Sequence, residues 1–432
     1  MLAAAAVTNA RAQAPGVALV GGTLIDGSGG EPIPNSVVLI RGARIETVGS
    51  IDSTPIPAGY ESISTEGMTV LPGLWDTHTH LMMSAGAVFE WQQKFDVDPA
   101  TAELIIAATA RQLLMSGVTS ARDPMITLDP SLEMRAQIAG GETPGPTFYT
   151  AGALLEHQAP EWAPTWRWSV SSPADGRAKV RQLARRGVDL IKVLCDSMTL
   201  EENMAIVDEA HRHGLKVASH WGSSEQSNIK CLASGVDDFQ HPGPMGELSP
   251  ALLAAFEQRL ADGPLYWTPT VGRYINADYL RQDPEMLDDP AWQAGLRPDM
   301  IAFVEESLRD FKRGLANSPR FDVAAFKRSF DRLRELGVQV TIGTDTGSVG
   351  HFHTQAVWLE LDAWVNHLDV DPMEAIVSAT SLPAAMMGVQ RDYGTVVAGK
   401  YADIIAVRGN PLRHIDVLRD PVLIIKHGIR YE

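Results

Sequence analysis

The middle of the chain, from about Met68 to Val389, alternates short apolar runs with segments of helical pattern. This alternation is typical of β-strand and α-helix units built around a parallel sheet. The runs that suit strands are residues 70–75, 118–121, 147–151, 190–194, 217–220, 238–240, 265–270 and 338–343. Eight such units in roughly 300 residues predict a (β/α)8 barrel of the TIM type, with the longest insertions at residues 152–172 and 272–300.

The two ends of the chain have a different sequence pattern, with short strand-like runs separated by glycine-rich turns. Residues 17–67 and 390–432 both show it, and two such ends can pair with each other across the barrel segment. The prediction is therefore an α/β chain in which residues 68–389 form the barrel and the two ends together form one small β-sandwich.

Residues 1–16 have the composition expected of an N-terminal leader segment. A small apolar run at residues 2–7 precedes Ala12-Gln13-Ala14, which has the small-x-small form of a signal-peptidase site. A signal-peptide remnant would predict a periplasmic or secreted protein. A plain alanine-rich leader would instead be consistent with a cytoplasmic one, and both interpretations stay open.

Composition narrows the choice of partner. The chain has 53 acidic and 36 basic residues, a net charge of -17, which would repel a phosphate backbone and an anionic bilayer. No later stretch reaches the ~18 apolar residues of a membrane span. The two cysteines, Cys195 and Cys231, are too few for a disulfide framework and lack metal-ligand spacing. We expect a homo-oligomer that acts on a small molecule and binds neither nucleic acid nor membrane.

Polar residues with metal-ligating chemistry stand at the ends of the predicted strands, where a βα barrel carries its active site. His78 and His80 follow the first strand two residues apart, so both can face one ion. A single histidine at a strand end is more often a hydrogen-bonded structural residue. A whole set at one end of the barrel is harder to explain in that way, and its members are His78, His80, Lys192, His220, His241 and Asp345.

Lys192 lies in the middle of a strand that is apolar on both faces. Burial favours the neutral amine, and a neutral lysine can react with carbon dioxide to form a carbamate, an anionic ligand able to bridge two cations. The alternative is an ion pair of Lys192 with Asp345 or Asp189.

Six motifs occur in this order along nearly the whole chain: Leu71–His80, Ile191–Val193, Ser219–Gly222, Gln240–Gly243, Gly343–Gly347 and Gly399–Asp403. Together they resemble the amidohydrolase superfamily, and within it the prolidase-like and imidazolonepropionase-like branch. The resemblance implies that His78, His80 and Asp345 hold the more buried of two divalent ions. It also implies that His220 and His241 hold the second ion, with carboxylated Lys192 bridging the pair, and we expect both ions to be zinc.

The same resemblance suggests catalytic roles. Asp345 would accept a proton from the attacking water and deliver it to the leaving nitrogen. His157, after the third strand, matches a position that stabilises the oxyanion, although it could be a solvated loop residue. Tyr274 matches a position of substrate contact but could instead pack, and His351 is a weaker candidate for contact with the substrate.

Tryptophans gather in the insertion after the third strand, where Trp162, Trp166 and Trp168 lie close together. We expect Trp166 and Trp168, with Trp221 after the ligand His220, to form a wall that binds a bulky aromatic group. The alternative is that they anchor the loop or bury a dimer contact.

The predicted function is hydrolysis of an amide bond in a dipeptide or an N-acyl amino acid of the ochratoxin type. The same site could cleave a carbamate, a urea or a lactone, because the barrel does not choose the substrate. A non-catalytic, dihydropyrimidinase-like scaffold is the alternative from another class. The complete set of six ligands argues against that alternative.

Overall fold

The computed structural model describes residues 16–95, 98–315, 317 and 319–431. The predicted leader at residues 1–16 therefore lies almost entirely outside the described residues. Among the described helices, none has the length and apolar character needed to cross a membrane.

All eight predicted barrel strands have an observed counterpart. They are β7 (Leu74–Asp76), β8 (Val118–Asp123), β9 (Thr147–Thr150), β12 (Leu190–Val193), β13 (Lys216–His220), β14 (Asp238–Gln240), β15 (Tyr266–Thr268) and β16 (Gln339–Val340). Every pairing between them is parallel. Two short strands of the insertion, β10 (Leu154–Glu156) and β11 (Arg167–Ser169), extend the sheet beside β12.

The strands form a three-stranded sheet, β7-β8-β9, and a seven-stranded sheet, β11-β10-β12-β13-β14-β15-β16. Backbone hydrogen bonds join the two sheets at both edges. Asp189 N donates to Thr150 O over 2.8 Å, and Thr77 N donates to Ile342 O over 3.1 Å. These contacts link the first strand to the last and bring the carboxyl ends of all eight to one face.

Helices surround the strands, as the alternating pattern predicts. Thr199 and Glu202 form a capping box at the start of α5, with Thr199 N 2.9 Å from Glu202 Oε2. The long helices between successive strands are α2 (Pro99–Met115), α3 (Leu128–Gly140), α4 (Pro173–Arg186), α5 (Leu200–Arg212), α6 (Glu225–Ala233), α7 (Pro250–Ala261) and α10 (Val323–Glu335).

Further helices come from the insertions and the end of the barrel segment: α1 (Val88–Phe95), α8 (Gly272–Gln282), α9 (Pro298–Leu315), α11 (Ala356–His367), α12 (Pro372–Ser378) and α13 (Ser381–Met386). Of these, α8 matters most for the site, because it begins at the carboxyl end of β15.

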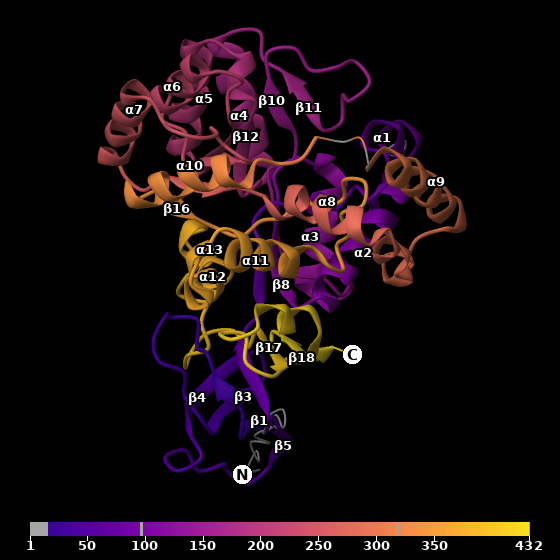
Figure 1. Cartoon of the computed structure of the whole chain (residues 1–432), viewed down its shortest axis with the longest axis vertical. Helices are drawn as coiled ribbons and strands as arrows, with labels where there is room; N and C mark the ends of the chain where they lie inside the picture. Colours follow the sequence, from indigo (N-terminus) through magenta and orange to yellow (C-terminus); the bar gives the residue numbers. More distant parts are fainter. Residues whose placement is uncertain (1–15, 96–97, 316, 318, 432) are drawn as a thin grey trace, which may run out of the picture.

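The two chain ends meet below the barrel (Figure 1). One sheet, β4 (Arg44–Ser50), β3 (Ser36–Arg41), β1 (Gly16–Val20) and β5 (Tyr60–Ser64), comes from the first end alone. The other combines both ends, in the order β19 (Ile429–Tyr431), β18 (Pro421–Lys426), β17 (Ile404–Arg408), β6 (Met68–Pro72) and β2 (Thr23–Leu24). One apolar cluster includes side chains of both sheets, among them Leu19, Val38, Ile404 and Ile425.

The first predicted strand, residues 70–75, divides between these two parts. Its first half belongs to β6 in the end sheet and its second half to β7 in the barrel. Gly73 stands at the division, where a Cβ atom would lie 2.2 Å from the side chain of Thr119. Only glycine allows the chain to pass so close to β8, and this contact fixes where the barrel begins.

Candidate metal centre and substrate cavity

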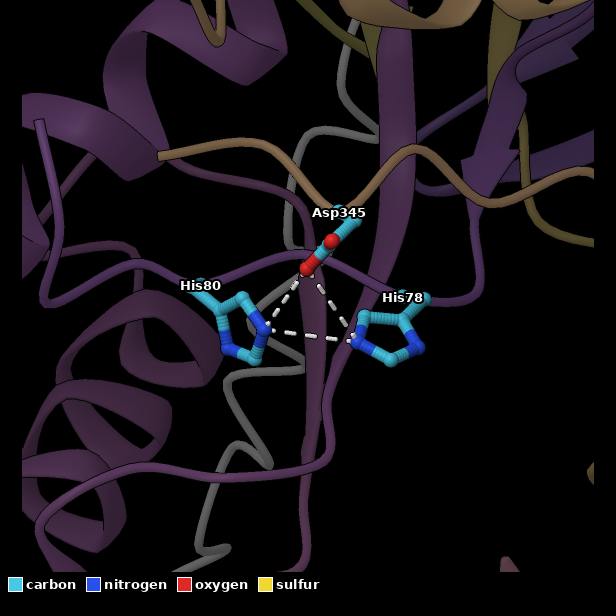
Figure 2. Close-up of side chains that lie close together, drawn as sticks. All are labelled: His78, His80 and Asp345. Carbon is cyan, nitrogen blue, oxygen red and sulfur yellow. Dashed lines mark hydrogen bonds and ion pairs between the residues drawn. The ribbon is translucent and has the colours of Figure 1, made fainter. Parts of the chain in front are cut away.

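Three predicted ligands come together at the carboxyl end of the barrel (Figure 2). His78 Nε2 and His80 Nε2 lie 3.3 Å apart, and Asp345 Oδ1 lies 3.6 Å from the first and 3.0 Å from the second. All three side chains are buried. Two imidazole nitrogens and a carboxylate oxygen at this spacing are a suitable donor set for a divalent cation.

Lys192, His220 and His241 complete the predicted set beside this cluster. His241 Nδ1 lies 3.6 Å from Asp345 Oδ2, and the rings of His220 and His241 have centroids 4.4 Å apart. Three buried nitrogens, Lys192 Nζ, His220 Nδ1 and His241 Nε2, have no hydrogen-bond partner among the described residues. Buried polar atoms are normally paired, so these nitrogens fit the ligands of a metal centre.

Lys192 is fully buried, and its side chain forms no ion pair with Asp189 or Asp345 among the described contacts. Asp189 instead binds Arg135, with 2.7 Å between Oδ2 and Nη1. Burial lowers the pKa of the Lys192 ammonium to about 7. Near neutral pH, Lys192 is therefore a neutral amine in a large fraction of the protein molecules, and this is the form that can react with carbon dioxide.

The two histidines of the first strand are held by different partners. His78 Nδ1 lies 2.5 Å from Gln240 Oε1, so an N–H at that position leaves Nε2 free to face the cluster. His80 Nδ1 lies 3.6 Å from Asp123 Oδ1. Burial by itself would lower the pKa of His80, but the carboxylates of Asp123 and Asp345 raise it to about 9. The protein environment thus favours positive charge at this point.

Backbone strain occurs at two of the predicted ligands. His241 and Asp345 have φ angles of 72° and 58°, in the left-handed region that non-glycine residues rarely adopt. The surrounding structure supports the first of these, because Trp221 Nε1 and Trp267 Nε1 both donate to His241 O, over 3.0 and 2.8 Å. Strained residues of this kind cluster at functional sites.

A cavity of about 730 Å³ opens above the six predicted ligands, and all six of them line it. Its volume is in the range of small-molecule sites. Trp166, Trp221 and Tyr274 contribute aromatic surface to the wall. Trp221 also stacks on Phe239, with ring centroids 4.1 Å apart, so it supports the wall as well as forming it.

Three other predicted site residues lie away from this cavity. The side chain of His157 is 46% exposed, and its Nδ1 lies 3.7 Å from Glu202 Oε1. Trp168 lines a separate hollow with Pro99 and Arg186, because it faces the side of β11 opposite to its neighbour Arg167, which lines the cavity. His351 is buried, and its Nε2 lies 3.0 Å from Thr344 O. These placements do not support contact of the three residues with substrate.

The structure also shows features that the sequence analysis missed. Arg273 lines the cavity and forms an ion pair with Asp345. Although burial opposes ionisation of Asp345, the charges of Arg273 and His241 lower the pKa of this carboxyl well below its usual range. The position of Arg273 could have identified it as a candidate site residue, because it lies five residues after the end of β15 and groups that follow barrel strands face the site.

Cys195 and Cys231 form a disulfide. It connects the short 3-10 helix η1 (Cys195–Ser197), which follows the lysine strand β12, to α6, which follows the histidine strand β13. Asp196 and Ser197 of η1 line the cavity. The disulfide therefore ties together two segments of the cavity wall, a pairing that a count of two cysteines did not predict.

Comparison with known proteins agrees with this architecture. Ochratoxinase from Aspergillus niger is 26% identical, over 93% of this chain and 82% of its own. Imidazolonepropionase from Deinococcus radiodurans is 28% identical, over 89% of this chain and 88% of its own. The crystal structure of a protein described as a prolidase, from Bifidobacterium longum, has a TM-score of 0.75 at 26% identity and covers 97% of this chain and 95% of that one.

The relatives and the structural neighbour identify the arrangement of strands as a TIM barrel and the protein as a hydrolase of carbon–nitrogen bonds. A family model described as the amidohydrolase family matches residues 69–428, which include the barrel and every predicted metal ligand. The chain belongs to the amidohydrolase family.

Proposed function

We propose that this protein is a binuclear metal-dependent amidohydrolase that cleaves the amide bond of a dipeptide or an N-acyl amino acid with a bulky aromatic group. The observation that carries the proposal is the buried set of histidines, lysine and aspartate below a cavity with an aromatic wall. The relatives named ochratoxinase and prolidase support this class of reaction.

The donor set fits two divalent ions, which we propose to be zinc. His78, His80 and Asp345 would hold the deeper ion, while His220 and His241 would hold the other. Lys192, as its carbamate, would bridge them, because its buried amine is otherwise unpaired among the described residues. The ions would supply a water that ionises near neutral pH and would polarise the scissile carbonyl.

Asp345 is placed to move the proton. Its Oδ1 faces the two histidines of the first strand, and its Oδ2 faces His241 and Arg273. The carboxylate can accept a proton from the attacking water and pass it to the leaving nitrogen, without which the amine is a poor leaving group. The neighbouring charges keep Asp345 ionised, which is the state in which a carboxylate can accept a proton.

The aromatic wall supports the choice of substrate. Trp166 is only 4% exposed and forms part of the cavity surface, while Tyr274 lies at the start of α8 on the cavity side. Flat apolar surfaces in a concave site favour an aromatic acyl group or side chain.

A substrate panel tests the proposal. Purified protein, stripped of metal and reloaded with zinc, is assayed against N-benzoyl amino acids, dipeptides, phenylureas, carbamates and lactones. We expect turnover of the amides that depends on zinc, with the largest kcat/KM for aromatic members. Zinc-dependent turnover of only ureas, carbamates or lactones would assign the alternative hydrolase activity, and a lack of any zinc-dependent turnover would favour the scaffold.

We further propose that residues 17–67 and 390–432 act as one β-sandwich beside the barrel of residues 68–389, and that the protein is a homo-oligomer. The sheet that combines strands of both ends supports the first point. The disulfide supports an oxidising location, periplasmic or secreted, because disulfides persist in such compartments. Non-reducing mass spectrometry of protein isolated from its native host tests the disulfide, and fractionation of the same cells tests the location.

A further inference from the structure

Two arginines line the cavity, and their hydrogen bonds differ. Two guanidinium nitrogens of Arg167 donate hydrogen bonds to Glu156: Nε to Oε1 over 2.5 Å and Nη2 to Oε2 over 2.7 Å. Arg273 contacts Asp345 through Nη1, and its Nε and Nη2 form no recorded hydrogen bond with the described residues. Arg273 therefore has N–H donors available to a ligand in the cavity, whereas Arg167 already forms a bidentate ion pair with Glu156.

The fold holds Arg273 at this place. It is the second residue of α8, and buried Glu360 accepts hydrogen bonds from Val271 N over 3.0 Å and from Gly272 N over 2.5 Å. A Cβ atom at Gly272 would lie 2.7 Å from Glu360 Oε2 and 2.8 Å from its Cα, so the start of the helix fits closely against α11. The arginine is thus anchored by its backbone while its side chain stays 31% exposed.

The position relative to the metal cluster limits what Arg273 can bind. Asp345 turns Oδ1 toward His80 and Oδ2 toward Arg273, so the guanidinium lies next to the reacting centre but on the side away from the two histidines of the first strand. A guanidinium presents parallel N–H groups that match the two oxygens of a carboxylate. In an N-acyl amino acid, the carboxylate is separated from the scissile nitrogen by one carbon atom.

We propose that Arg273 binds the carboxylate of the amino acid whose amide bond is cleaved, and so selects substrates with a free carboxylate beside that bond. This inference rests on the proposed function, to which it adds the residue that binds the free carboxylate of the dipeptide or N-acyl amino acid. Arg273 is a specificity residue in this role, because it contacts a part of the substrate that does not react.

The experiment compares N-benzoyl-L-phenylalanine with N-benzoyl-2-phenylethylamine, which has the same rings and the same amide but lacks the carboxylate. For the zinc-loaded enzyme we expect kcat/KM to favour the acid by about 10- to 150-fold, the range of a hydrogen bond to a charged group. Arg273→Gln should remove this preference, mainly by raising KM for the acid. Arg167→Gln, which removes the other cavity arginine, should retain the preference between the two substrates.

A binding measurement separates this inference from the proposed function. Calorimetry of the zinc-loaded protein compares L-phenylalanine with 2-phenylethylamine, and we expect the wild type to favour L-phenylalanine and Arg273→Gln to lose that difference. If neither amide is hydrolysed but this difference is found, the proposed function fails and carboxylate binding by Arg273 stands.

Three results would overturn the inference. The first is a preference for the acid that survives in Arg273→Gln. The second is an equal fall of kcat for both amides in that variant, which would place Arg273 at the scissile carbonyl instead. The third is a wild-type protein with no preference for the carboxylate in either turnover or binding.

Discussion

The floor and the rim of the cavity are built in different ways. The floor consists of groups within or just after β-strands, such as His78, Lys192 and Asp345, all of them buried. The rim consists of insertions and helix starts, including the segment around Trp166, the disulfide-linked η1 and the first turn of α8. The floor thus belongs to the barrel itself, while the rim is attached to it.

This difference separates reaction from specificity. The floor holds the groups that suit metal binding and proton transfer, and its backbone is strained at His241 and Asp345. The rim holds aromatic rings and Arg273, which suit recognition of the rest of the substrate. Changes in the floor should therefore remove activity for every substrate, and changes in the rim should alter which substrates are preferred.

Removal of metal is the largest expected effect. Dialysis against a chelator should abolish turnover, because the proposed ions lower the pKa of the attacking water toward neutral, and zinc should restore it. Elemental analysis of the active protein should find about two divalent ions per chain. Full activity of metal-free protein would contradict the proposed role of the floor.

Loss of Lys192 should have the next largest effect on activity. Lys192→Ala should reduce kcat/KM by more than ~10²-fold, since loss of even the outer partners of a metal site costs 10- to 100-fold. Added short carboxylic acids should partly restore activity by occupying the space of the carbamate. Lys179→Ala, on the outer helix α4, is the matched control. An unmodified Lys192 in the electron density of active, metal-loaded crystals would exclude the carbamate.

Removal of the proton acceptor should have a similar but separable effect. Asp345→Asn keeps an oxygen near the metal but cannot accept the proton, so kcat should fall by at least ~10² while the fold is retained. Circular dichroism and bound-metal analysis check the second part. A kcat close to the wild-type value would remove Asp345 from proton transfer.

The rim offers a sharper test, because two tryptophans of one insertion line different hollows. Trp166→Ala should reduce the preference for aromatic over aliphatic substrates by roughly 10- to 200-fold in kcat/KM, the effect of losing one well-packed apolar contact. Trp168→Ala should leave that preference unchanged, since its side chain lines a separate hollow. The same loss of preference in both variants would show that the insertion acts as a whole.

The disulfide should have the smallest effect on turnover. Replacing Cys195 and Cys231 with serine should lower the free energy of unfolding by ~2–4 kcal/mol, the usual contribution of a disulfide. KM should rise more than kcat falls, because the bond ties together segments of the rim. Thermal unfolding and steady-state kinetics with and without reductant provide the measurements. A loss of zinc in the double variant would mean that the rim also supports the floor.

The floor could be predicted from the sequence because its signals are local. Strands with apolar residues on both faces end in polar ones, and the parallel arrangement brings all such ends to one side of the barrel. His78, His80 and Asp345 needed no knowledge of loop structure to be placed together, and the structure brings them within ligand distance. The capping box at Thr199 was predictable for the same reason, since both partners lie in one turn.

The rim was decided by tertiary structure. Whether Trp166 or Trp168 faces the cavity depends on how β11 lies beside β10, and His157 turns to Glu202 because η1 and α5 pack against its loop. Arg273 reaches Asp345 only because Glu360, far along the chain, holds the start of α8. The sequence by itself determined the strands of the barrel and the polar residues that follow them through periodicity, whereas contacts between distant segments decided which side chains surround the cavity.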